Sequence, residues 1–174
     1  MDNKLIFTGP MGAGKTTAIG SISEVPPIRT DVRTTDEGKQ RKYTTTVAMD
    51  YGYITLDDGG RIHLYGTPGQ ERFDYMWTIL TQGGIGLILL LDNARPSPLD
   101  DLTFYLDAFK DFIEKTAVVI GVTRTDLSNH VGLDDYRNKL FERGQVYPVF
   151  EVDAREPNDV KILIHALLAT LQYG

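Results

Sequence analysis

The chain has 174 residues, with 24 acidic and 18 basic side chains and a formal net charge of −6. This length suits one domain with a sizeable core, so we expect a single domain over residues 1–174. Without a basic surplus no nucleic-acid partner is expected, and without cysteine no disulfide or thiolate metal site can form.

The first half of the chain predicts a strand, a glycine-rich turn, a helix and a hairpin. Residues 5–8 form an apolar strand, and a helix is expected from about Lys15. Residues 25–44 are polar and contain two adjacent prolines, which is typical of a mobile loop. Alternating apolar residues at 47–53 then predict a strand, which a turn at residues 57–60 joins to a strand at 62–65.

The second half alternates helices with buried strands. Residues 85–91 form a continuous apolar run, which is typical of a strand buried on both faces. Ser97 and Pro98 predict the start of a helix that carries one apolar stripe to Ile113. The chain therefore predicts an α/β fold, a six-stranded and mostly parallel sheet with one antiparallel edge strand, and about five helices. Its remaining elements are a helix at 71–82, a strand at 117–122, a helix at 133–143, a strand at 149–152 and a helix at 160–171.

The chain ends carry no recognisable targeting or lipidation signal. Residues 1–4 do not resemble a signal peptide, residue 2 is not glycine, and the last four residues include no cysteine. The longest apolar run is too short to span a bilayer. We therefore expect a cytoplasmic protein with no lipid anchor in the chain.

Residues 9–16 match the pattern G-x-x-x-x-G-K-[ST] between a predicted strand and a predicted helix. Glycines let successive backbone N–H groups turn toward a phosphate, and the helix N-terminus adds positive potential. An accidental glycine turn is the alternative, but every fixed position of the pattern is filled. The motif predicts a P-loop NTPase of three-layer sandwich architecture. Its nucleotide-binding residues are expected to be Gly9, Met11, Gly12, Ala13, Gly14, Lys15, Thr16 and Thr17, with Lys15 reaching the β- and γ-phosphates and Thr16 binding Mg²⁺.

Four further segments resemble the Ras superfamily of small GTPases. Residues 46–51 (T-V-A-M-D-Y) resemble the T-I-G-V-D-F of Rab-type proteins, and residues 66–73 (G-T-P-G-Q-E-R-F) resemble their D-T-A-G-Q-E-R-F. Residues 123–126 (T-R-T-D) resemble the guanine-reading N-K-x-D, and residues 153–155 (D-A-R) resemble S-A-K. The segments occur in the family's order over essentially the whole chain. The short hairpin and its L-Y-x-x-P-G-Q sequence are most similar to bacterial MglA-type GTPases.

The resemblance implies a GTP-binding switch that hydrolyses GTP to GDP with Mg²⁺. Gln70 would orient the attacking water, the Gly69 N–H would contact the γ-phosphate, and Thr46 would close over it and bind the metal. Asp126 would accept two hydrogen bonds from guanine, and the Ala154 N–H would meet its O6 atom. Thr44 and Thr45 are alternatives to Thr46, and a capping role is the alternative for Asp126. The base-binding residues implied by the resemblance are Thr123, Arg124, Asp126, Asp153, Ala154 and Arg155.

Four positions depart from the family pattern. Gly66 replaces an aspartate that holds a Mg²⁺-bound water, which predicts weaker Mg²⁺ affinity. Met11 is bulky beside the γ-phosphate, which predicts slow hydrolysis without a partner. Thr123 replaces an asparagine, and its one hydroxyl cannot offer both the amine donor and the separate carbonyl acceptor of an amide. Arg124 replaces lysine, but its flat guanidinium can still lie over the purine.

Two other functions compete with the switch. Residues 88–92 (I-L-L-L-D) have the form of a Walker-B strand, in which Asp92 would serve a P-loop ATPase or small-molecule kinase. The other alternative is a module that binds GTP with negligible turnover.

As a switch, the chain would carry two moving segments, about residues 25–46 and 66–82, and would bind protein regulators and effectors through them. The MglA-type resemblance implies a dimeric roadblock-type protein as one such partner. Trp77 would either belong to the partner-binding face or lie in a buried stripe with Phe73 and Leu80.

Overall fold

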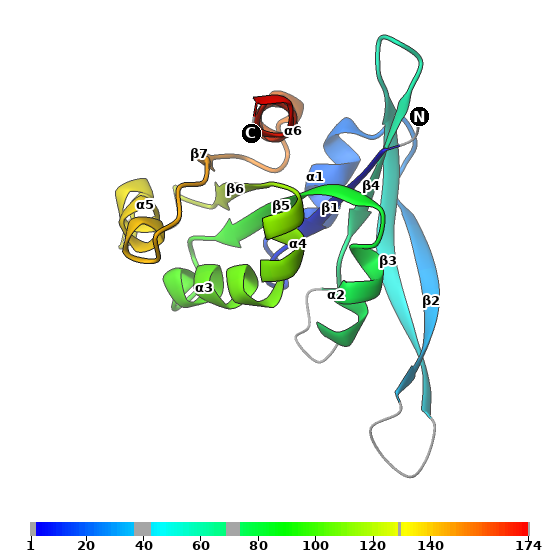
Figure 1. The fold of residues 1–174 in the computed structure, drawn as a ribbon, viewed down its shortest axis with the longest axis horizontal. Coiled ribbons are helices and arrows are strands. Elements are labelled where there is room, and N and C mark those ends of the chain that lie inside the picture. Colours follow the sequence, from blue (N-terminus) through cyan, green and yellow to red (C-terminus); the bar gives the residue numbers. More distant parts are fainter. Residues whose placement is uncertain (1–2, 37–42, 69–73, 129, 174) are drawn as a thin grey trace.

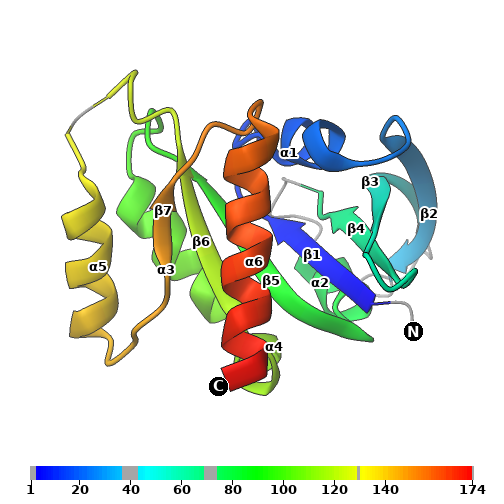
Figure 2. The ribbon, with the colours of Figure 1, turned by 90° about the horizontal axis from the view of Figure 1, so that it is seen from above.

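A computed structural model describes residues 3–36, 43–68, 74–128 and 130–173 of the chain. These residues form one sheet in the order β2-β3-β4-β1-β5-β6-β7, with helices on both faces (Figures 1 and 2). The strands are β1 (Asn3–Thr8), β2 (Ile28–Asp36), β3 (Tyr43–Thr55), β4 (Arg61–Gly66), β5 (Gly84–Asp92), β6 (Val118–Thr123) and β7 (Val149–Glu151). The helices are α1 (Lys15–Ile22), α2 (Asp74–Leu80), α3 (Pro98–Ala108), α4 (Lys110–Lys115), α5 (Leu133–Glu142) and α6 (Pro157–Tyr173).

The α/β fold and the six predicted strands are confirmed. Strands β1, β4, β5, β6 and β7 run parallel, and β3 pairs with β4 in the antiparallel sense. The hairpin between β3 and β4 closes where the Leu56 N–H donates to the Gly60 carbonyl at 2.7 Å, with Gly59 at a φ of 86°. Glycine takes this left-handed conformation at little cost, as the predicted turn requires.

The expected loop at residues 25–44 is wrong over its middle part, because residues 28–36 form β2. This seventh strand pairs antiparallel with β3 from Ile28 opposite Tyr51 to Asp36 opposite Tyr43. Its Thr and Val residues favour extended backbone, and the long partner strand supplies a hydrogen-bonding edge. The β2–β3 pair extends beyond the rest of the sheet (Figure 1). The two prolines lie just before β2, where a missing N–H costs no ladder bond.

The apolar residues of the central strands divide between two cores. Leu5, Phe7, Ile88 and Leu90 face one core, which α1 and α6 cover. Ile6, Leu87, Leu89 and Leu91 face the other core, which α2, α3, α4 and α5 cover. Because side chains alternate along a strand, a continuous apolar run serves both cores.

The expected helix from Ser97 to Ile113 is broken at Phe109 into α3 and α4. Phe109 has φ and ψ of −103° and 15°, outside helical geometry, and is buried. Its ring stacks on Trp77 with 5.0 Å between ring centroids, and Trp77 also stacks on Tyr105 at 5.4 Å. Trp77 and Leu80 are buried, so the buried stripe is the correct alternative for them. Phe73 lies outside the described residues.

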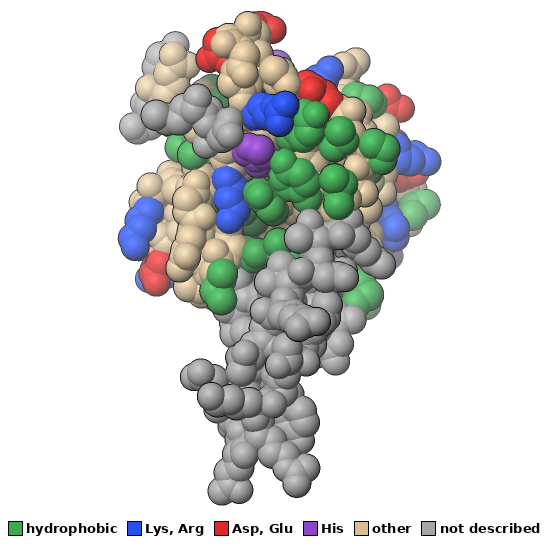
Figure 3. All heavy atoms as spheres, turned by 90° about the vertical axis from the view of Figure 1, so that its right-hand side faces the viewer, with side chains coloured by type: hydrophobic (Ala, Val, Ile, Leu, Met, Phe, Trp, Pro, Cys, Tyr) green, Lys and Arg blue, Asp and Glu red, His purple; other side chains and the backbone are tan. Residues whose placement is uncertain are grey.

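The aromatic side chains on β3 and β4 are only half-buried. Tyr51 and Tyr65 lie on the same face of β3 and β4, with 5.1 Å between ring centroids, and the Tyr51 hydroxyl hydrogen-bonds His63 Nδ1 at 2.7 Å. Arg61 lies over the ring of Tyr53 at 4.5 Å. Seen from the side of β2 and β3, hydrophobic side chains gather next to Lys, Arg and His side chains (Figure 3). Among the described residues, no helix is both long and apolar enough to span a bilayer.

Candidate functional site

The P-loop connects β1, at the centre of the sheet, to α1. On one side of β1 lies β4 and on the other lies β5, so the chain changes direction across the sheet at this strand. In open α/β sheets, ligands bind at the carboxyl ends of the strands beside such a switch point. The P-loop therefore lies where the fold class predicts a ligand.

Three glycines give the P-loop its shape. Gly9, Gly12 and Gly14 have φ values of 144°, 82° and 98°, which L side chains rarely adopt. A Cβ atom at Gly9 would lie 2.0 Å from the carbonyl oxygen of Leu90, so only glycine fits there against β5. The Ala13 N–H donates to the Pro10 carbonyl at 3.1 Å and closes the loop.

Lys15 is buried beneath the loop. Its Nζ donates to the carbonyls of Gly9 and Pro10 at 2.5 and 3.0 Å, which accounts for two of its three donor hydrogens. Burial lowers the pKa of Lys15 to about 8, although the negative charge of Asp50 acts in the opposite direction. Burial destabilises the charged form of Lys15. A phosphate bound in the loop would bring negative charge close to Nζ and stabilise that charged form again.

Thr16 lies in the first turn of α1 and contacts a carboxylate on β3. Its hydroxyl donates a hydrogen bond to Oδ2 of Asp50 on β3. A hydroxyl oxygen and a carboxylate beside a phosphate-binding loop are the hard oxygen ligands that Mg²⁺ takes in proteins. The residues present therefore fit the cation that the P-loop motif implies.

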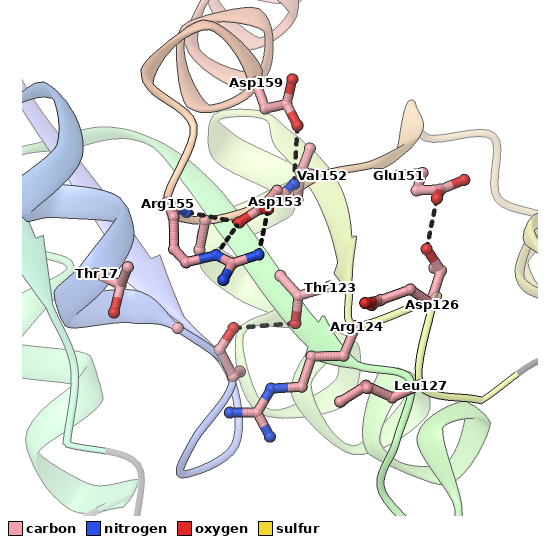
Figure 4. A pocket seen from close by; sticks show the side chains of 14 residues that line it. Thr17, Thr123, Arg124, Asp126, Leu127, Glu151, Val152, Asp153, Arg155 and Asp159 are labelled. Carbon is pink, nitrogen blue, oxygen red and sulfur yellow. Dashed lines mark hydrogen bonds and ion pairs between the residues drawn. The ribbon is translucent and has the colours of Figure 1, made fainter.

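Beside the P-loop lies a cleft of about 810 Å³ (Figure 4). Nine of the predicted nucleotide-binding residues line it, and Figure 4 shows the Asp126 carboxylate directed into it. The lining residues that were predicted are Ala13, Gly14, Thr17, Thr123, Arg124, Asp126, Asp153, Ala154 and Arg155. The fold thus joins three segments that are far apart in the sequence.

Direct contacts hold these segments together. The Thr123 hydroxyl lies 3.2 Å from the Ala13 carbonyl and 3.2 Å from the Leu91 carbonyl, both of which accept from it. A Cβ atom at Gly14 would lie 2.9 Å from Cβ of Ala154, so the P-loop packs closely against residues 153–155. Thr123 therefore joins the base loop to the P-loop through its one hydroxyl, although it lacks the amide of the family pattern.

Arg124 and Arg155 are both engaged by carboxylates. Arg124 has a φ of 58°, and its Nη1 lies 3.4 Å from Oδ2 of buried Asp92. Arg155 donates from Nε and Nη2 to Asp153 at 3.0 and 2.8 Å. These hydrogen bonds from Arg155 lower the pKa of Asp153 to about 2.

Several cleft residues were not predicted. The Thr125 hydroxyl donates to Glu151 at 2.5 Å, and Oδ2 of Asp159 accepts from the Asp153 N–H at 2.9 Å. Asp159 in the first turn of α6 carries a sequence signal for this role, because acidic residues favour helix N-termini. The unpredicted lining residues are Thr125, Leu127, Glu151, Val152 and Asp159.

Some predicted residues are placed only in part. Met11 is 57% exposed at the P-loop surface. Thr46 lies in β3 opposite Arg33 of β2, and its side chain is outside the described part of the chain. Gly69 and Gln70 also lie outside the described residues.

Comparison with known proteins gives one family and several distant relatives. A family described as "Conserved hypothetical ATP binding protein" matches residues 28–171. The GTP-binding protein ypt2 of Schizosaccharomyces pombe is 26% identical over 145 residues, which cover 82% of this chain and 64% of that protein. The Ras-related protein Rab-13 of Mesocricetus auratus is 27% identical over 143 residues, covering 80% and 62%.

An uncharacterized protein of Methanocaldococcus jannaschii is 30% identical over 98 residues, which cover 56% of each chain. The chain thus matches about 56–64% of the length of these relatives.

Proposed function

The chain belongs to the family described as conserved hypothetical ATP-binding proteins and is a nucleotide-binding P-loop protein related to Rab GTPases, and we propose that its nucleotide is GTP. In this proposal the protein is a switch that hydrolyses GTP slowly to GDP and phosphate.

The observation that carries the proposal is the position of Asp126 in the cleft beside Ala154. Guanine presents two donors, N1–H and the 2-amino group, to one carboxylate. Adenine has neither donor on that edge and presents a lone pair, which repels the carboxylate. Hydrogen bonds to charged groups are worth about 1.5–3 kcal/mol each, so Asp126 alone supports selection against ATP. Ala154 also lines the cleft and packs against the P-loop at Gly14, and its backbone N–H would meet guanine O6.

The ATPase alternative requires Asp92 to serve the cation. The contacts of Asp92 favour this role less than the GTPase proposal. Oδ1 of Asp92 accepts from the Ala94 N–H at 2.9 Å, and Oδ2 faces Arg124 at 3.4 Å. A carboxylate with both oxygens engaged at the base side of the site is poorly placed to serve a cation beside Thr16.

In hydrolysis, Lys15 would hold the β- and γ-phosphates and neutralise charge that develops during transfer. Gln70 would orient the attacking water, while Gly69 and Thr46 would contact the γ-phosphate. Mg²⁺, when bound, neutralises phosphate charge, and Thr16 and Thr46 would hold it.

Met11 would leave little room for an activating group beside the γ-phosphate, so the protein alone would be slow. An arginine supplied by a partner accelerates such reactions by about 10³–10⁵. The resemblance of the hairpin sequence to MglA-type GTPases would make a dimeric roadblock-type protein the first partner to test, through the segments at about 25–46 and 66–82.

The test is to identify the nucleotide extracted from natively purified protein and to measure phosphate release from GTP and ATP. We expect guanine nucleotide and slow release from GTP, which Met11→Gly raises and Gln70→Leu lowers. Bound adenine nucleotide with release from ATP would establish the ATPase. Bound GTP with no release under any condition would leave a binding module.

A further inference from the structure

The carboxylate that position 66 lacks is present in the structure on the neighbouring strand. Asp50 of β3 and Gly66 of β4 are directly opposed in the antiparallel pair. A Cβ atom at Gly66 would lie 3.4 Å from Cβ and 3.6 Å from Oδ2 of Asp50. The Asp50 carboxylate therefore lies directly beside the position where a side chain of residue 66 would start.

Asp50 also accepts a hydrogen bond from Thr16, the residue that is expected to bind the metal ion. The Thr16 hydroxyl donates its one hydrogen to Asp50 Oδ2. A hydroxyl has one donor hydrogen and two lone pairs, so this bond orients the hydrogen and leaves the lone pairs of Thr16 for a cation. Asp50 thus holds Thr16 in the orientation that cation binding requires.

Asp92, the other acidic residue considered for the cation, has its carboxylate engaged elsewhere. Asp92 is engaged by the Ala94 N–H and Arg124. Among the described residues, no group of three or more His, Asp or Glu side chains could hold a metal ion. Mg²⁺ needs no such group, because it keeps several waters and is usually bound by one or two carboxylates together with substrate phosphates.

We propose that Asp50 supplies, from β3, the carboxylate of the Mg²⁺ site that the Ras-like pattern places at position 66. It positions Thr16 and adds the negative charge that favours a divalent cation beside the phosphates. This inference rests on the proposed nucleotide-binding function and assigns its metal site a residue of a different strand.

The experiment measures release of a fluorescent GDP analogue with Mg²⁺ and with EDTA. For the wild type we expect EDTA to accelerate release strongly. Partners that orient metal ligands typically contribute about 10–100-fold to metal affinity. Asp50→Asn should therefore release nucleotide roughly 10–100-fold faster in Mg²⁺, with no change in EDTA. Titration with Mn²⁺, followed by its electron paramagnetic resonance, should show weaker binding by a similar factor.

Two further variants sharpen the test. Asp57→Asn, in the exposed turn of the same hairpin, removes the same charge and should leave Mg²⁺ dependence unchanged. Asp50→Ala combined with Gly66→Asp should restore the Mg²⁺ dependence, because a carboxylate at position 66 starts from β4 beside the place that the Asp50 carboxylate leaves.

If Asp50→Asn keeps the wild-type ratio of release rates in Mg²⁺ and EDTA, the assignment of Asp50 is wrong. The same holds if Asp92→Asn, and not Asp50→Asn, changes that ratio. Either result leaves nucleotide binding unaffected. A wild-type protein that binds no GDP analogue would instead overturn the proposed function. Circular dichroism of each variant checks that the fold is retained.

Discussion

Replacing Thr123 with valine tests whether one hydroxyl joins the base loop to the P-loop. Valine has nearly the shape of threonine, so the change removes the hydroxyl and leaves no cavity. Thr123 is 4% exposed, and its single hydrogen is shared between the carbonyls of Ala13 and Leu91 at 3.2 Å each. One buried hydrogen bond contributes about 0.5–1.5 kcal/mol net, so we expect Thr123→Val to lower the free energy of unfolding by about 1 kcal/mol.

This loss has two measurable consequences. In a protein of this size, 1 kcal/mol lowers the melting temperature by roughly 2–4 °C. Because Ala13 belongs to the P-loop, GDP affinity should also fall, by about fivefold if the whole 1 kcal/mol is felt there. Urea unfolding and titration with a fluorescent GDP analogue measure the two effects. Thr123→Ser is the matched control, since it keeps the hydroxyl. Equal stability and equal GDP affinity of the valine and serine variants would refute the role of this hydroxyl.

Four further substitutions test the P-loop and two positions outside it. Lys15→Ala should lower nucleotide affinity by roughly 10–100-fold in the same titration, because it removes the cation that lies against the carbonyls of the phosphate-binding loop. Gly9→Ala should abolish nucleotide binding, since its Cβ would meet the Leu90 carbonyl oxygen at 2.0 Å, whereas Gly59→Ala, with no atom within 4 Å, should cost only about 1 kcal/mol in urea unfolding. Tyr136→Phe should lower the free energy of unfolding by about 1–2 kcal/mol, because it removes the 2.7 Å hydrogen bond to Asn93; an unchanged urea midpoint would contradict this.

The sequence was informative wherever local pattern and local structure coincide. The P-loop pattern predicted its glycine conformations because left-handed backbone favours glycine. The apolar runs at residues 85–91 and 117–122 predicted strands buried on both faces, and β5 and β6 have this arrangement. The base loop was located by its resemblance to a known family, and Thr123 and Asp126 do line one cleft.

The errors arose where contacts between distant residues decide the structure. Strand β2 has a polar sequence with no clear alternation, and its pairing with β3 makes it a strand. At the helix break, Phe109 stacks on Trp77, a contact between distant residues that no local pattern encodes. Asp50 was visible as part of a family motif, but its place opposite Gly66 depends on the register of β3 with β4.

The most direct test of the central claim is the base specificity of the protein and of its Asp126→Asn variant. Competition of GDP, ADP and xanthosine diphosphate against a fluorescent GDP analogue gives the three affinities. We expect the wild type to prefer GDP to ADP by at least about 100-fold, from two hydrogen bonds to a charged group. Asp126→Asn should lose GDP affinity and gain xanthosine diphosphate affinity, because an amide can donate to the extra carbonyl of xanthine. Equal affinity of the wild type for GDP and ADP, with no change in Asp126→Asn, would contradict the account.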